Sequence, residues 1–367
     1  MSKNSLLYIG NVIHFQQLNE LVEKNEFIGS ISISKHHYLT IKGLGELYSR
    51  VLIFSKSQTR NKLVNSKFNN IEYFYSNNSS SLFNLFYLLN FIRKNHPHVI
   101  MDALIIKNSL MVVLLCLLLK VKYTTFNSDI PQFMTNNKVF IFFSSLINKF
   151  SSGFIFVSVA MNEIINKRKK PFIVVDTIVD DPPNYQAKTK EFSVFYSGYI
   201  SEMNGVDLLC EAFLDCNFPN SSLTVIGEGK ILEDLRKKYY YSKIIKIFGK
   251  TSNDVIINKQ VESWLLVNPR ILNQAQNNYS FPIKLSEYML SGSAVISTKL
   301  PYLKGVFDEF IYYFLDDTLQ SIKLGLREFY SKSFLHNQYK SGKDFIIKTR
   351  HYRVQSGRIF AFLNQIF

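Results

Sequence analysis

The stretch YSFPIKLSEYMLSGSAVIST, residues 279–298, carries a lysine and a glutamate three residues apart. Pro282 suits the first turn of a helix, and Gly292 suits its end before the apolar run that follows. A cation in the first turn, here Lys284, opposes the helix dipole at a cost of about 0.3 kcal/mol or more. That placement makes sense where an anionic ligand meets the ammonium and the free N–H groups of the helix start together.

Glu287 lies one turn further along the same predicted helix. Its carboxylate could accept two hydrogen bonds from a vicinal diol such as a ribose. Phosphate and ribose are separated by a similar distance in a nucleotide. The same spacing also fits a surface ion pair between Lys284 and Glu287, worth about 0.2–0.5 kcal/mol. Spacing alone leaves both interpretations open.

Short apolar runs alternate with helical patterns along the chain, which predicts parallel sheets covered on both faces. In the first half we expect strands at 5–13, 50–57, 71–76, 98–106, 123–127, 153–160 and 171–179, and helices at 82–94, 107–120, 136–150 and 160–168. In the second half we expect strands at 193–200, 222–229, 244–250, 263–270, 293–300 and 311–317, and helices at 205–215, 230–240, 282–291 and 316–331.

The alternation breaks at 179–192, where two prolines precede a polar and charged stretch. We therefore predict an α/β protein of two doubly wound domains, residues 1–180 and 190–349, with a linker between them. The tail from 338 to 367 is predicted to be helical. Ligands of open α/β sheets bind beyond the carboxyl ends of the strands, so the loops after the strands are expected to hold the site.

Composition narrows the class of partner. Lysine and arginine number 43 against 28 aspartate and glutamate residues, for a net charge of +15. This surplus favours an anionic partner: nucleic acid, an anionic membrane or a phosphorylated substrate. Three cysteines in apolar or helical contexts indicate a reduced interior without a disulfide framework or a zinc site. The apolar run 109–119 is too short to span a bilayer, which needs about 20 residues, and it predicts a helix buried against the sheet.

The second half resembles the donor-binding domain of retaining GT-B glycosyltransferases, family 4 in particular, in the branch of bacterial capsule, exopolysaccharide and O-antigen clusters. The segments that carry the resemblance are YSGYISEMNGVDLLCEAF (196–213), LTVIGEGKILEDL (223–235), IKIFGK (245–250) and LLVNPR…YSFPIKLSEYMLSGSAVIST (265–298). The resemblance implies two Rossmann-like domains facing across a cleft, with a C-terminal helix, about 350–367, that returns to the first domain.

The resemblance also assigns roles to residues of this chain. It implies that Glu287 binds the ribose hydroxyls and that the turn at 197–199 approaches the diphosphate. The donor-binding residues expected in this way are Ser197, Gly198, Tyr199, Glu228, Gly249, Lys250, Tyr279, Ser280, Phe281, Pro282, Lys284 and Glu287. For Glu228 and its flanking glycines, a tight turn into the next helix is an equally simple explanation.

This chain departs from the family at three positions. The family usually has arginine and lysine where Tyr199 and Asn204 stand, and the first glutamate of its Glu-x7-Glu motif is replaced by Tyr279. Two cations and one carboxylate of the usual site are thereby missing. Arg270 and Lys284 are the predicted replacements that stabilise the leaving diphosphate. Arg270 could instead be an ordinary surface residue after its strand.

The first half carries fewer expected site residues. Gly10 after the first strand would let the backbone approach the donor phosphates. Asp129, in the turn SDIPQF, is a possible acceptor-side or catalytic carboxylate, although aspartate is also common in such turns. His36 and His37 are candidate acceptor contacts at a helix entry, although lone histidines are more often structural and neither is named as a catalytic base.

No cofactor and no metal are expected, because lysine and arginine can stabilise the diphosphate and no Asp-x-Asp cluster is present. The expected partners are a UDP- or GDP-linked sugar, a polyprenyl-diphosphate-linked or glycan acceptor, and an anionic membrane surface. The expected location is the cytoplasm, at the inner face of the plasma membrane. Nucleic-acid binding is disfavoured by the lack of a recognisable motif. A degenerate GT-B subunit that binds a glycan or a protein partner is the alternative, and a nucleotide-sugar epimerase ranks last.

Overall fold

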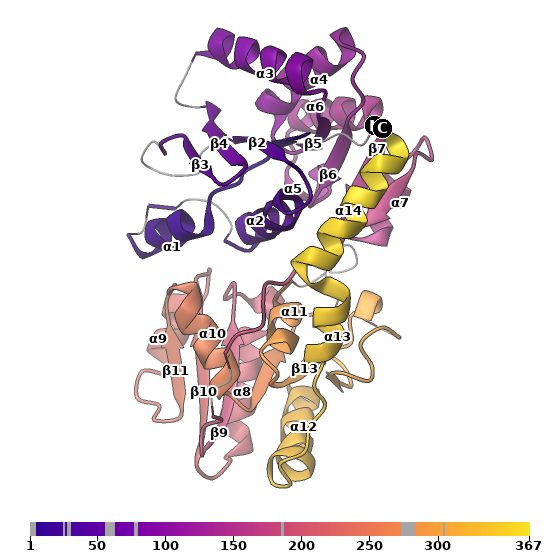
Figure 1. Cartoon of the computed structure of the whole chain (residues 1–367). Coiled ribbons are helices and arrows are strands. Elements are labelled where there is room, and N and C mark those ends of the chain that lie inside the picture. Colours follow the sequence, from indigo (N-terminus) through magenta and orange to yellow (C-terminus); the bar gives the residue numbers. More distant parts are fainter. Residues whose placement is uncertain are drawn as a thin grey trace. The chain divides into compact units, whose positions relative to one another are not determined.

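The computed structural model describes residues 5–24, 26–27, 31–55, 63–76, 80–184, 187–272, 283–303 and 305–367. These residues form two compact units. The first unit comprises described residues up to 180 together with 350–367, and the second comprises those from 181 to 349 (Figure 1).

The first unit is built on a sheet whose described strands run in the order β3-β4-β2-β1-β5-β6-β7-β8. All are parallel except β3, which pairs antiparallel with β4. The strands are β1 (Ser5–Ile9), β2 (Arg50–Ser55), β3 (Ser66–Phe68), β4 (Ile71–Tyr75), β5 (His98–Asp102), β6 (Thr124–Asn127), β7 (Gly153–Phe156) and β8 (Phe172–Val174). The helices are α1 (Phe15–Glu23), α2 (Ile31–Gly45), α3 (Ser81–Asn95), α4 (Ile106–Leu118), α5 (Pro131–Met134), α6 (Lys138–Phe150), α7 (Val159–Ile165) and α14 (Tyr352–Ile366).

Helices cover both faces of this sheet because the side chains of each strand alternate between them. On β1, Leu6 and Tyr8 belong to the core that packs on α2 and α14. Leu7 and Ile9 belong to the opposite core, which packs on α3, α4 and α6. Buried on both faces, the strands are apolar throughout, as expected of a parallel sheet.

The C-terminal helix α14 packs on α2 of the first unit. The Ser356 hydroxyl donates to the Thr40 carbonyl over 3.2 Å, and Arg353 pairs with Glu46 at 2.9 Å. A Cβ on Gly43 would overlap the Ser356 side chain, so the glycine allows the two helices to approach closely. The predicted return of the C-terminal helix to the first domain is confirmed.

The second unit has a six-stranded parallel sheet in the order β11-β10-β9-β12-β13-β14. Its strands are β9 (Phe192–Ser197), β10 (Ser221–Ile226), β11 (Ile245–Phe248), β12 (Leu265–Asn268), β13 (Ala294–Thr298) and β14 (Tyr312–Phe314). Its helices are α8 (Val206–Cys216), α9 (Leu232–Lys238), α10 (Asn253–Glu262), α11 (Ile283–Leu290), α12 (Leu319–Phe329) and α13 (Lys343–Arg350). Apolar residues of α8, α9 and α12 share one core with the sheet. The predicted α/β fold of two doubly wound sheets is confirmed.

The structure corrects several sequence-based expectations. The helices α1, α5 and α10 and the strand β3 were not predicted, and α2 was anticipated only as a helix entry at His36 and His37. The tail is not one helix: α13 ends at Arg350, and the His351 side chain caps α14 by accepting a hydrogen bond from Arg353 N. The run 109–119 does form a helix, α4, but it is not buried all round. Its outward residues Leu114, Leu117 and Leu118 are exposed. Within the described residues, no helix combines the length and the hydropathy that crossing a membrane requires.

Candidate functional site

The site predicted from the sequence lies at the carboxyl ends of β9, β10 and β12 and at the start of α11, all within the second unit. In this sheet β9 is bonded to β10 on one side and to β12 on the other. From β9 the strand order continues through β10 and β11 on one side and through β12, β13 and β14 on the other. Open α/β sheets bind ligands at the point where the strand order reverses in this way.

Lys284 extends from the first turn of α11 to the end of β9. Its Nζ donates to the Tyr196 hydroxyl over 3.0 Å and stands 4.3 Å from the centre of the Tyr196 ring. A Cβ on Gly198, whose φ is +140°, would meet the same Nζ, so the ammonium lies directly beside the glycine backbone. Burial and the nearby Arg270 guanidinium lower the pKa of Lys284 to about 7, while the Glu287 carboxylate acts in the opposite direction.

A chain of hydrogen bonds connects Lys284 to Arg270 through Tyr199 and Asn204, two of the three positions at which the sequence departs from the family. The Tyr196 hydroxyl donates to the Tyr199 carbonyl over 2.8 Å. The Asn204 amide donates to the same carbonyl, also over 2.8 Å. Arg270 Nε then donates to the Asn204 side-chain oxygen over 3.3 Å. Arg270 is therefore held against the loop after β9, and the structure brings both predicted replacement cations to one end of the sheet.

A tyrosine that was not predicted connects α11 to β9. The Tyr288 hydroxyl accepts from Ser197 N over 2.8 Å and donates to Ser197 O over 3.1 Å. Tyr288 is fully buried and stands next to half-buried Glu287 on α11. Tyr288 was not singled out from the sequence, and it is buried together with Leu285 and Met289.

The glycines on either side of Glu228 are explained by a close contact between two backbones rather than by the tight turn considered above. A Cβ on Gly227 would overlap the Gly198 carbonyl oxygen, and one on Gly229 would overlap the Ile200 carbonyl oxygen. The loops after β9 and β10 touch through their backbones, with Ile200 N donating to Glu228 O over 2.8 Å. These glycines therefore allow two site loops to pack side by side.

Glu228 and Lys250 stand together at the ends of β10 and β11. The Lys250 ammonium lies 3.9 Å from the Glu228 carboxylate, and Glu228 is largely exposed. Both are thus on the predicted edge of the sheet. Gly249 precedes Lys250 and, like it, is half-buried.

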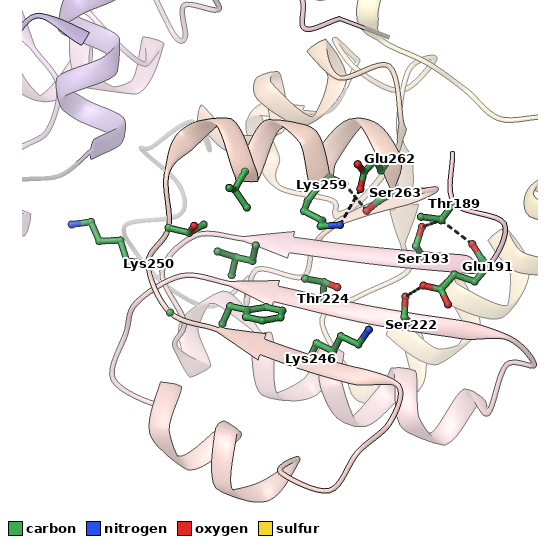
Figure 2. Close-up of a pocket in the computed structure, with 15 residues that line it drawn as sticks. Thr189, Glu191, Ser193, Ser222, Thr224, Lys246, Lys250, Lys259, Glu262 and Ser263 are labelled. Atoms are coloured by element: carbon green, nitrogen blue, oxygen red, sulfur yellow. Dashed lines mark hydrogen bonds and ion pairs between the residues drawn. The ribbon is translucent and has the colours of Figure 1, made fainter. Parts of the chain in front are cut away.

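A groove of about 540 Å³ lies on the face of the second sheet beneath α10 (Figure 2). Of the predicted donor residues described by the structure, only Gly249 and Lys250 line it, and in Figure 2 the Lys250 side chain points away from the sheet. Its polar groups largely satisfy one another, as the bond of 2.7 Å from Ser222 to Glu191 and the 2.9 Å pair of Lys259 with Glu262 show. The cluster around Lys284 comprises Tyr196, Gly198, Asn204, Arg270 and Lys284. None of these residues lines the groove, so the groove is separate from the cluster.

Two predicted residues of the first unit follow strands at the equivalent edge of that sheet. Gly10 directly follows β1, is buried and leaves room for the Tyr8 ring. Asp129 lies between β6 and α5, and its carboxylate accepts from Ile130 N over 2.8 Å, as in an ordinary aspartate turn. Burial raises the pKa of Asp129.

The two histidines predicted as acceptor contacts lie inside α2, and both are buried. His37 Nδ1 is 2.6 Å from the Tyr8 hydroxyl, and His37 Nε2 is 3.5 Å from the Asp102 carboxylate. Burial lowers the pKa of His36 to about 3, so its ring is neutral at pH 7. In this structure both rings belong to the core, and neither is available to an acceptor.

Four predicted donor residues, Tyr279, Ser280, Phe281 and Pro282, lie outside the described residues. The site described above therefore consists of the ends of β9, β10, β11 and β12 and of α11 from Ile283 onward.

The second unit resembles one known family. Residues 179–344 match the family described as glycosyl transferases group 1. The matched stretch contains every described residue of the cluster around Lys284. No curated protein sequence is similar enough to count as a relative.

Solved structures agree in fold over the whole chain. Sucrose-phosphate synthase (tll1590) from Thermosynechococcus elongatus has a TM-score of 0.72 at 10% identity, covering 99% of both chains. Anabaena Alr3699/HepE in complex with UDP has a TM-score of 0.65 at 12% identity, covering 98% of this chain and 100% of that one. The lipopolysaccharide outer core galactosyltransferase WaaB has a TM-score of 0.61 at 15% identity, covering 98% and 99%. The GT-B fold is thereby established.

Proposed function

We propose that this protein is a retaining family 4 glycosyltransferase that moves a sugar from a nucleoside-diphosphate donor to a lipid-linked or oligosaccharide acceptor in bacterial surface polysaccharide synthesis. The observation that carries the proposal is that Lys284 lies beside the Gly198 backbone and Arg270 is held against the same loop after β9, with Glu287 one turn along α11. Two cations at the carboxyl end of a parallel sheet make an anion site, and the carboxylate beside them suits a diol.

The distribution of charge supports a diphosphate in particular. The Tyr196 ring and hydroxyl hold the Lys284 ammonium without neutralising it. Arg270 is fixed by Asn204, so its guanidinium is oriented before a ligand arrives. Charge-assisted hydrogen bonds from such preoriented cations to phosphate oxygens are about twice as strong as neutral ones.

These groups define the proposed chemistry. The bond between the anomeric carbon and the diphosphate oxygen breaks, and its electron pair leaves with the diphosphate. Lys284 and Arg270 stabilise that developing charge, which is the main contribution a protein makes to such a step. The acceptor hydroxyl oxygen forms the new bond to the anomeric carbon from the same face of the sugar, and its proton passes to an oxygen of the departing diphosphate. Because two side-chain cations perform this role, the reaction is proposed to need no metal or other cofactor.

Three further points belong to the proposal. HepE was solved with UDP, which supports a uridine donor among the UDP- and GDP-linked sugars considered. WaaB is a lipopolysaccharide galactosyltransferase, which supports an acceptor of the surface polysaccharide class. A net charge of +15 supports a location at the cytoplasmic face of the plasma membrane, whose lipids are anionic. Asp129 and Gly10 are retained as proposed contacts from the first unit.

The test is release of nucleoside diphosphate from UDP-glucose, UDP-galactose, UDP-N-acetylglucosamine and GDP-mannose, with and without a bacterial lipid extract as the source of acceptor. We expect release from one donor, unchanged by EDTA and at least about tenfold slower in Glu287→Ala. Glu328→Ala, which removes an exposed helical glutamate on α12, is the matched control and should behave as wild type. Binding of a nucleotide without release from any donor would favour the degenerate subunit instead.

A further inference from the structure

Three helices lie side by side on one face of the first sheet: α3, α4 and α6 (Figure 1). Their inner sides form a core with the strands. Their outer sides are also apolar, which is unusual for a layer in contact with water. The residues that define this apolar face are between 61% and 78% exposed; they are Leu82 and Phe86 on α3, Leu114 and Leu118 on α4, and Val139 and Phe142 on α6.

The helix α4 shows the contrast most clearly. Its inward residues Val112 and Cys116 are buried, and this side alone attaches the helix to the sheet. The outward residues Leu114, Leu117 and Leu118 are exposed and are not needed for that packing. Polar residues at these positions would leave the contact between the helix and the sheet intact. Exposed apolar surface spread over neighbouring helices typically marks a binding surface.

The charges around the apolar face have one sign. Exposed lysines stand at the ends of α4 and α6: Lys107, Lys120, Lys138 and Lys149. From residue 73 to 162 the acidic residues are only Asp102, which is buried, and Asp129, which is half-buried in its turn. The layer thus combines long apolar side chains with cations and lacks exposed carboxylates.

We propose that the apolar face of α3, α4 and α6 docks the protein onto an anionic lipid bilayer. The leucine and phenylalanine side chains would enter the boundary between headgroups and acyl chains, and the lysines would meet lipid phosphates. A second copy of the chain fits less well, because two identical faces would bring lysines against lysines. This inference rests on the proposed function, since a lipid-linked acceptor is reached at a bilayer, and it names the surface that makes the contact.

The first test is flotation of the purified protein with vesicles of phosphatidylglycerol and phosphatidylcholine, compared with vesicles of phosphatidylcholine alone. We expect binding to the anionic vesicles that falls more than about tenfold in the double variant Leu114→Gln, Leu118→Gln, because each leucine loses its transfer from water. The matched control is Leu214→Gln with Leu324→Gln, two leucines of the second unit that are each 45% exposed. Equal flotation of the double variant and wild type would overturn the proposal.

A second measurement tests the depth of contact. The chain has one tryptophan, Trp264, which lies in the second unit. We expect brominated phosphatidylcholine in the anionic vesicles to quench the added indole of Leu118→Trp and to leave the wild-type signal unchanged. Absence of quenching despite flotation, or a concentration-dependent dimer that the double variant abolishes, would overturn docking through this face. Nucleoside-diphosphate binding, followed without vesicles, should be normal in the double variant, so failure of docking is distinguishable from failure of the proposed function.

Discussion

Lys284 donates a hydrogen bond to the Tyr196 hydroxyl over 3.0 Å while its ammonium stands 4.3 Å from the centre of the same ring. This relationship ties the first turn of α11 to the end of β9. A phenol and a ring face orient the ammonium without cancelling its charge. The position that opposes the helix dipole is therefore stabilised by an aromatic partner that carries no counter-charge.

Replacing Lys284 by glutamine should weaken UDP binding by about 2 kcal/mol, or about thirtyfold, the usual loss for a hydrogen bond to a charged group. Isothermal titration calorimetry measures this directly. Lys299→Gln is the control, because Lys299 is an exposed lysine of the same unit, 3.9 Å from Asp308. A Lys284→Gln protein that binds UDP as tightly as wild type would remove Lys284 from the site.

UDP binding should also depend on pH. Because burial and Arg270 lower the pKa of Lys284 to about 7, the free protein loses this cation as pH rises through 7. A bound diphosphate favours the charged form and raises that pKa, so binding above pH 7 takes up a proton. We expect affinity to fall by up to about tenfold per pH unit above 7. Calorimetry in buffers of different ionisation enthalpy should show the proton uptake in wild type, and its persistence in Lys284→Gln would contradict this assignment.

Glu287 is expected to recognise the ribose. Wild type should prefer UDP over 2′-deoxy-UDP by about tenfold, because the deoxy analogue leaves one carboxylate hydrogen bond unmade. Glu287→Gln should bind both nucleotides with similar, weaker affinity, whereas Glu328→Gln should keep the preference. If wild type binds the two nucleotides equally well, the carboxylate does not contact the 2′-hydroxyl.

Tyr288→Phe should lower the free energy of unfolding by about 1–3 kcal/mol, since Ser197 N and O both lose their buried partner. Urea denaturation followed by far-ultraviolet circular dichroism gives the value. Tyr241→Phe removes the hydroxyl of a tyrosine that is 92% exposed and should change little. Equal stability of the two variants would mean that the Tyr288 hydroxyl does not support the end of β9.

Much of the fold was predictable because buried parallel strands are apolar on both faces and the helices between them have a clear apolar stripe. The strands predicted at 50–57 and 71–76 correspond to β2 and β4. The helix α10 was missed because its sequence, NDVIINKQVE, is polar and only part of it is buried. The short antiparallel strand β3 carries too few residues for a pattern. The outward leucines of α4 were read as buried because a single sequence does not tell which neighbours cover a helix.

The site was predictable in part. The positions of Lys284 and Arg270 follow from strand ends and a helix start, and the structure places both beside the loop after β9. The bridge formed by Asn204 was not predictable, since it depends on a contact across 66 residues of sequence. The burial of His36 and His37 was likewise hidden, because their helix α2 packs with α14 from the far end of the chain.

The central claim is that the end of β9 and the start of α11 form a nucleoside-diphosphate site. Its most direct test is thermal unfolding of the wild-type protein with UDP, GDP, ADP, CMP and dTDP, each with and without EDTA. We expect a clear rise in Tm with one nucleoside diphosphate, unchanged by EDTA and absent in Glu287→Ala. No rise with any of these nucleotides would contradict it.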